Sequence, residues 1–187
     1  MGNRLSKIYT RTGDEGMTGL STGERVRKDS LRIEAMGDVD ELNSIVGMVL
    51  ALELPAQVAD CLVDVQHDLF NLGAEISMPG EQLLDPARID WLEATLDSFN
   101  DELPPLVEFI LPGGGLAAAT CHLARSVCRR SERHLVALAA EEPVTTVART
   151  YLNRLSDLLF VLARIISREA GEGEVFWQSA RLDGNDA

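Results

Sequence analysis

The 187-residue sequence contains few aromatic residues, few cysteines and no long apolar run. Aromatic residues make up 5% of the chain and hydrophobic residues 45%, which predicts an aliphatic core packed between helices. Cys61, Cys121 and Cys128 show no CxxC spacing and lie within helical patterns, which favours reduced core thiols over a metal site. No apolar stretch approaches the roughly 18 residues of a membrane span, and no signal-peptide pattern follows the start. We therefore expect a cytoplasmic protein.

Basic charge is also scarce. The chain has 17 Lys and Arg against 30 Asp and Glu, a formal net charge of −13. An acidic surface repels nucleic-acid backbones and anionic membranes, so we expect neither as a partner. Any phosphate-binding site must therefore be a small basic region of an otherwise acidic surface.

One segment near the start has the residue types of a local phosphate site. It combines hydroxyls, an arginine and glycines able to approach a ligand closely: Thr10, Arg11, Thr12, Gly13, Gly16, Thr18 and Gly19. Lys28 follows in a basic stretch and can reach back to this segment. The spacing differs from a P-loop, and no strand precedes it as in a Rossmann turn. The alternative is a glycine-rich arm without a ligand.

The rest of the chain has helical periodicity. We expect four long helices, from about residue 38 to 52, 56 to 76, 116 to 141 and 145 to 170, and a shorter one over 90 to 102. Residues 109–115 end in a proline and three glycines and are expected to form an ordered loop. The sequence therefore predicts an all-α, up-and-down helical bundle preceded by a glycine-rich nucleotide-binding loop. We expect one domain over 1–187, with an arm over 1–36, a bundle over 37–170 and a tail over 171–187.

The helix expected over residues 116 to 141 carries a charged stripe. Arg125, Arg129, Glu132 and Arg133 fall within about 100° of the helix circumference, whereas Arg130 lies off this stripe at about 140°. A solvated face with internal ion pairs is one explanation, and a polyphosphate clamp is the other. His134 follows and is interpreted as a surface or packing residue.

Two further helices carry polar groups that need an explanation. Asn153 lies on a polar stripe of the otherwise apolar last helix, where a buried polar group needs a structural or ligand partner. Asp38, Asp40 and Glu41 lie at the expected start of the first helix, where capping and the helix dipole account for part of the acidity. No serine, cysteine or histidine has the context of a nucleophile or general base.

Five sequence motifs, in matching order and spacing, resemble those of PduO-type ATP:cob(I)alamin adenosyltransferases. They are TRTGDEGMTGL at 10–20, GDVDELNS at 37–44, FILPGG at 109–114, HLARSVCRRSER at 122–133 and YLNRLSD at 151–157. The resemblance covers nearly the whole chain. Departures are Met36 for a frequent aromatic, Asp38 for Thr or Glu, and Ser131 for Ala.

The resemblance implies a homotrimer of helical bundles with an active site at each subunit interface. The reaction transfers the 5′-deoxyadenosyl group of ATP to the cobalt of cob(I)alamin and releases triphosphate. Mg²⁺ would be held mainly by the ATP phosphates, so no metal ligand is assigned to the chain. Because cob(I)alamin is itself the nucleophile, the absence of a base in the sequence agrees with this chemistry. A hand-over of the product to an adenosylcobalamin-dependent enzyme is also implied.

The resemblance also implies roles for individual residues. Phe109 would lie against the lower face of the corrin and displace the axial base, and Asp40 and Arg125 would pair at the interface. Arg129 would act on the phosphates during the reaction. The ATP-binding set would be Thr10, Arg11, Thr12, Gly13, Thr18, Gly19, Lys28, Arg129, Arg130, Glu132, Arg133 and Asn153.

Two other functions stay open at this point. A non-catalytic ATP-binding trimer, acting as an adenosylcobalamin carrier or sensor, would keep the phosphate loop but would not need Phe109 or the Asp40 and Arg125 pair. A phosphotransferase should instead show a base for its acceptor and carboxylates for Mg²⁺ beside the phosphates. No clear set of that kind is present in the sequence.

Overall fold

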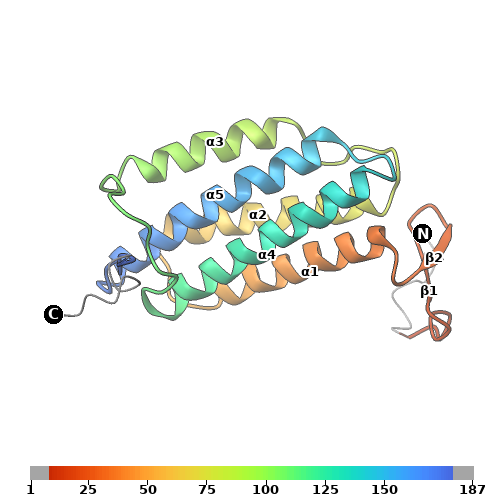
Figure 1. Cartoon of the computed structure of the whole chain (residues 1–187), viewed down its shortest axis with the longest axis horizontal. Coiled ribbons are helices and arrows are strands. Elements are labelled where there is room, and N and C mark those ends of the chain that lie inside the picture. The colour runs from red at the N-terminus through yellow and green to blue at the C-terminus, as the bar shows by residue number, and fades with distance from the viewer. Residues whose placement is uncertain (1–8, 179–187) are drawn as a thin grey trace.

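A computed structural model describes residues 9–178 as a helical bundle with a small β-hairpin at one end (Figure 1). The first eight residues of the expected arm and the last nine of the expected tail lie outside the described part. The elements in chain order are β1 (Met17–Gly19), β2 (Arg25–Arg27), α1 (Leu31–Leu50), α2 (Ala56–Ile76), α3 (Ala87–Asn100), α4 (Gly115–Ala139) and α5 (Thr146–Glu169). The all-α, up-and-down arrangement predicted from the sequence is confirmed.

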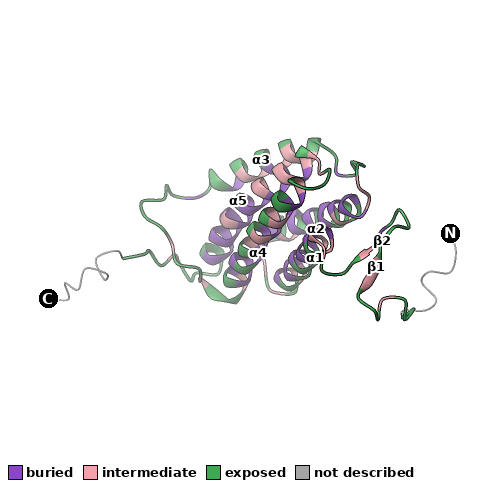
Figure 2. Ribbon diagram, turned by 45° about the vertical axis from the view of Figure 1, so that its right-hand side comes forward, coloured by how far each residue is buried: buried purple, intermediate pink, exposed green. Residues whose placement is uncertain are grey.

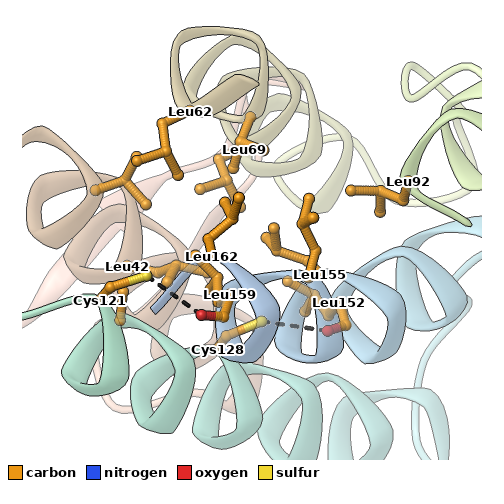
Figure 3. Packing of buried hydrophobic residues seen from close by; sticks show 14 of the residues in the cluster. Leu42, Leu62, Leu69, Leu92, Cys121, Cys128, Leu152, Leu155, Leu159 and Leu162 are labelled. Carbon is orange, nitrogen blue, oxygen red and sulfur yellow. Dashed lines mark hydrogen bonds between the residues drawn. The ribbon is translucent and has the colours of Figure 1, made fainter. Parts of the chain in front are cut away.

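The helices form because their apolar residues recur on one face. α4 packs against both α1 and α5, α2 packs on α1, and α3 packs on α5. Buried residues occupy the facing sides of these helices, whereas the hairpin is mostly exposed (Figure 2). Figure 3 shows leucines from four helices meeting in this core, including Leu42, Leu62, Leu92 and Leu155. Such an aliphatic core is what the low aromatic content predicted.

The cysteines are core residues, as expected. All three are free and buried. The thiols of Cys121 and Cys128 donate to the Leu159 and Leu152 carbonyls at 3.3 and 3.2 Å, which ties α4 to α5 (Figure 3). Burial raises the pKa of Cys121 to about 12.

The first helix begins earlier than predicted. The sequence placed its start near Asp38, but α1 begins at Leu31. Arg32 is 2% exposed in its first turn, where it donates to the Ile76 carbonyl at 2.5 Å and to Glu142 at 2.7 Å. These tertiary partners make a buried arginine acceptable, which periodicity could not reveal. Asp38 is therefore in the helix interior and does not cap it.

The expected loop before α4 is held in place by residues 175–177. Ile110 forms an isolated antiparallel bridge with Phe176, the Leu111 N–H donates to the Val175 carbonyl at 2.8 Å, and the Trp177 N–H donates to the Phe109 carbonyl at 2.7 Å. This loop lies at the opposite end of the bundle from the hairpin (Figure 1). Within residues 9–178, none of the helices has the length and apolar character needed to cross a membrane.

Candidate functional site

The N-terminal arm folds over itself to display hydroxyls and cations. The hydroxyls of Thr10 and Thr12 are 2.8 Å apart, and Arg11 between them has a positive φ of 61°. Arg25, on β2, donates to the carbonyls of Thr12 at 2.5 Å and Met17 at 3.3 Å. Arg25 thus closes the arm into a loop, a role that its position in the sequence did not reveal.

Lys28 reaches back to the loop as the sequence suggested. A Cβ added to Gly13 would lie 3.1 Å from Lys28 Nζ and 3.2 Å from the Met17 carbonyl oxygen. Gly13 therefore leaves room for the ammonium group beside the loop backbone, and Gly16 makes the turn with a φ of 81°. The Lys28 N–H also donates to the Gly16 carbonyl at 2.9 Å. A cation, hydroxyls and backbone groups converge here, which suits a polyphosphate.

A cleft of about 740 Å³ opens beside this arm, between the hairpin, α1 and α2. Thr18, Lys28 and Asp40 line it together with apolar residues of α1 and α2. Phe70 is 73% exposed at this cleft, a large apolar exposure for a helix surface. The sequence analysis missed Phe70, because an exposed aromatic has no periodic signature.

The arginine stripe of α4 faces outward beside α5. Arg129 and Arg133 are exposed, and Arg133 Nη1 donates only to the Arg129 carbonyl, at 3.0 Å. Glu132 accepts a hydrogen bond from Asn153 Nδ2 at 3.0 Å. Asn153 thus has a structural partner within the chain, and its Oδ1 accepts from Arg154 at 2.9 Å. Among residues 9–178, the guanidinium groups of Arg129 and Arg133 enter no ion pair and stay available to an anion.

Arg130 points away from that stripe, as its wheel position indicated. Its Nε donates to Asp38 Oδ1 at 3.1 Å, and its Nη2 pairs with Glu41 on α1. These two carboxylates raise the pKa of Arg130 against the lowering effect of desolvation. An ATP contact by Arg130 would have to compete with these two acids.

A second cleft, of about 570 Å³, lies at the other end of the bundle. Phe109, His122, Arg125 and Phe160 are among its lining residues. Phe109 is 76% exposed, and Trp177 stands edge-on to it with 6.4 Å between ring centroids. The sequence placed Phe109 on a loop, but only the fold brings the C-terminal segment of 174–177 beside it.

His122 and Arg125 form the wall of this second cleft on α4. Burial and the neighbouring Arg125 charge lower the pKa of His122, so the imidazole is neutral at pH 7. Arg125 Nε and His122 Nδ1 are buried and make no hydrogen bond. Among residues 9–178, Arg125 forms no ion pair, and a buried arginine nitrogen without a partner is costly.

The predicted site residues therefore divide between two ends of one chain. Thr10, Lys28 and Asp40 belong to the arm and the cleft beside it. Phe109 and Arg125 belong to the second cleft, at the other end of the bundle. α1 has 20 residues and is about 30 Å long, which sets the scale of the separation between hairpin and loop. Among the described residues of one chain, Asp40 and Arg125 form no ion pair.

Comparisons with known proteins all match cobalamin or corrinoid adenosyltransferases. A sequence model of a family described as cobalamin adenosyltransferase matches residues 8–166. A cobalamin adenosyltransferase of Cupriavidus metallidurans is 56% identical over 182 residues, 97% of this chain and 99% of the relative. A corrinoid adenosyltransferase of Bacillus subtilis is 41% identical over 94% of each chain. A solved variant PduO-type ATP:corrinoid adenosyltransferase from Lactobacillus reuteri, complexed with cobalamin and ATP, superposes with a TM-score of 0.88 at 31% identity, over 92% of this chain and 100% of that one.

Proposed function

The chain belongs to the cobalamin adenosyltransferase family, and we propose that two copies join their opposite ends to build each of its active sites. The enzyme transfers the 5′-deoxyadenosyl group of ATP to cob(I)alamin and gives adenosylcobalamin and triphosphate. The observation that supports a shared site is the division of the site residues between two clefts at opposite ends of the bundle. A homotrimer closes such head-to-tail contacts into a ring.

The reaction is a substitution at C5′ of ATP. The electron pair of the reduced cobalt forms the cobalt–carbon bond, and the bond between C5′ and the triphosphate oxygen breaks with its electrons on triphosphate. No proton has to be moved, which agrees with thiols that are buried and kept protonated by their raised pKa. The protein has to align C5′ with cobalt and to stabilise the charge on the leaving group.

We place ATP on the arm. The hydroxyls of Thr10, Thr12 and Thr18, the loop glycines Gly13 and Gly19, Arg11 and Lys28 would bind the phosphates. Arg129, Glu132, Arg133 and Asn153 would complete this site from α4 and α5 of a second copy, and Arg130 would hold α1 against α4 unless ATP draws it away from its acids. Arg129 and Arg133 would meet the charge that develops on triphosphate. Mg²⁺ would be held mainly by the ATP phosphates.

Asp40 and Arg125 are proposed to pair between subunits. Asp40 is exposed on α1, and Arg125 Nε is buried without a hydrogen bond on α4. Within the described part of the chain neither forms an ion pair, so a pair between copies would satisfy both and hold the two half-sites in register.

Phe109 is proposed to lie against the lower corrin face. Its ring is exposed on a loop that the segment of 174–177 supports by backbone hydrogen bonds. An apolar ring at this place would exclude the axial base and water from cobalt, which makes the corrinoid easier to reduce.

A non-catalytic carrier or sensor has no support in the relatives, which are named for the transferase activity. A cytoplasmic location, a single domain with an arm over 1–36, a bundle over 37–170 and a tail over 171–187, and hand-over of adenosylcobalamin remain parts of the proposal.

The activity is tested with chemically reduced cob(I)alamin, MgATP and purified protein without oxygen. The visible spectrum should show adenosylcobalamin while triphosphate appears in equal amount. ATP binding without either product would contradict adenosyl transfer, and ADP would indicate phosphoryl transfer.

The shared site is tested by mixing two inactive variants. Lys28→Ala removes a cation from the arm, and Arg129→Ala removes one from α4. In each mixed trimer, one of the three sites would combine an intact arm with an intact α4 from the neighbouring copy, which is about a quarter of all sites in a random equal mixture. Activity restored by co-expression supports the shared site, and its absence in confirmed mixed trimers places both halves in one chain.

A further inference from the structure

Three potential metal ligands lie outside the residues assigned to the reaction. Glu34 and Asp38 are four residues apart on α1, so they share one face of the helix. His134, on α4, faces them, and the ligating atoms of all three lie within 4.8 Å of one another. The three residues come from two helices that are far apart in the sequence. Only the packing of α1 against α4 brings them together.

Two atoms of this cluster lack a hydrogen bond. Asp38 is only 5% exposed, and its Oδ2 lies 2.5 Å from Nδ1 of His134. Neither atom makes a hydrogen bond. The two atoms are closer than the roughly 3.4 Å that separates two ligand atoms of one tetrahedral Zn²⁺ ion, so they would move apart by about 1 Å to share a cation. A protonated His134 paired with Asp38 is the competing explanation.

The surroundings also favour a cation. Arg130 Nε donates to Asp38 Oδ1 at 3.1 Å, which orients the carboxylate so that Oδ2 is directed toward His134. Glu41 is the second acid bound by Arg130. The carboxylates of Glu34, Asp38 and Glu41 carry three negative charges against one positive charge on Arg130, which leaves an excess of two.

We propose that Glu34, Asp38 and His134 bind one first-row divalent cation, with Zn²⁺ as the preferred ion. Imidazole nitrogen with two carboxylates is a ligand set for Zn²⁺ and its neighbours, whereas Mg²⁺ and Ca²⁺ take oxygen ligands. Glu34 is exposed and borders solvent, so water can complete the coordination. The ion would connect the first two turns of α1 with α4. Because α1 begins three residues after Lys28, this link would also hold the base of the arm.

The test is calorimetric titration of the nucleotide-free protein with Zn²⁺, together with the visible absorption of bound Co²⁺. Glu34→Gln and His134→Ala each remove one ligand. His67→Ala is the matched control, because His67 is an exposed histidine on α2 outside the cluster. The wild type and His67→Ala should bind one ion per chain, and the other two variants should bind it at least about tenfold more weakly.

Glu34→Gln keeps the shape of an exposed side chain, so a loss of binding in this variant is not a folding defect. Zn²⁺ should also raise the melting temperature of the wild type but not of His134→Ala. Failure of the wild type to bind, or equal affinity in His134→Ala, would rule out the proposed metal site of Glu34, Asp38 and His134. The titration contains neither ATP nor corrinoid, so its outcome is independent of the adenosyl-transfer proposal.

Discussion

Replacing Gly114 with alanine should destabilise the protein and loosen the loop that carries Phe109. Gly114 precedes α4 with a φ of 86° and a ψ of 45°, in the left-handed region. An added Cβ would lie 2.2 Å from Ser167 Oγ and 2.6 Å from Ser167 Cβ, so Ser167 would have to move.

The size of the effect follows from three costs. An alanine in the left-handed region costs about 1–2 kcal/mol. Overpacking against α5 costs roughly 1–3 kcal/mol. Displacing Ser167 also breaks its 2.7 Å hydrogen bond to the Gly173 carbonyl, which contributes about 1 kcal/mol. The sum of about 3–6 kcal/mol is a large part of the roughly 5–15 kcal/mol that stabilises a typical domain.

The same change should affect the corrinoid side of the site more than the ATP side. Gly173 leads into the segment whose Val175 and Trp177 form backbone hydrogen bonds with the loop. Releasing this segment frees Phe109, whereas the arm lies at the other end of the bundle (Figure 1). The KM for cob(I)alamin should rise, and the dissociation constant for ATP should stay near the wild-type value.

Gly113→Ala is the matched control. Gly113 has no positive φ, and the nearest atom to its added Cβ is the Leu111 carbonyl oxygen at 3.9 Å. Thermal and urea unfolding followed by circular dichroism should show a large loss for Gly114→Ala and little change for Gly113→Ala. Unfolding free energies for the two variants within about 0.5 kcal/mol of each other would refute the reasoning.

Three further predictions concern the proposed site and the core. Asp40→Asn and Arg125→Lys should each lower turnover more than they weaken ATP binding, because the pair would align the half-sites; near-normal rates in both variants would argue against the pair. Phe109→Ala should slow product formation from cob(II)alamin with a reductant far more than from prereduced cob(I)alamin, and equal slowing of both would exclude its effect on the axial base. Burial raises the pKa of Cys61 and Cys121 from 9.0 to about 12, so between pH 9 and 12 the unfolded chain loses these protons while the folded chain keeps them. The free energy of unfolding should therefore fall as pH rises above 9, by up to about 1.4 kcal/mol per pH unit for each thiol, and urea midpoints that stay constant from pH 9 to 10 would contradict it.

Much of the fold could be predicted because long apolar repeats dominate it. α2 has the predicted bounds, and α4 and α5 agree to within one or two residues. The first helix was placed seven residues too late, because Gly37 is a poor helix former and interrupts the pattern near its start. Buried Arg32 pairs with residues that follow more than forty positions later. The three-residue strands of the hairpin are too short to have a pattern of their own.

The candidate site was predictable only in parts. Lys28 beside Gly13 was anticipated from their nearness in sequence, and the position of Arg130 off the charged stripe was anticipated from the helical period. The contact of Trp177 with Phe109 and the closeness of His134 to Asp38 were not, since no local rule relates residues that far apart.

The sequence by itself determined the residue types of the phosphate loop, the helical faces and the aliphatic character of the core, since each depends on neighbours within a few positions. The family resemblance also followed from short motifs in the sequence. Only the tertiary structure decided which end of the bundle each site residue occupies, and that Asp40 and Arg125 form no ion pair with each other among the described residues of one chain. The physical reason is that helix packing sets these placements, through contacts between segments that are distant along the chain.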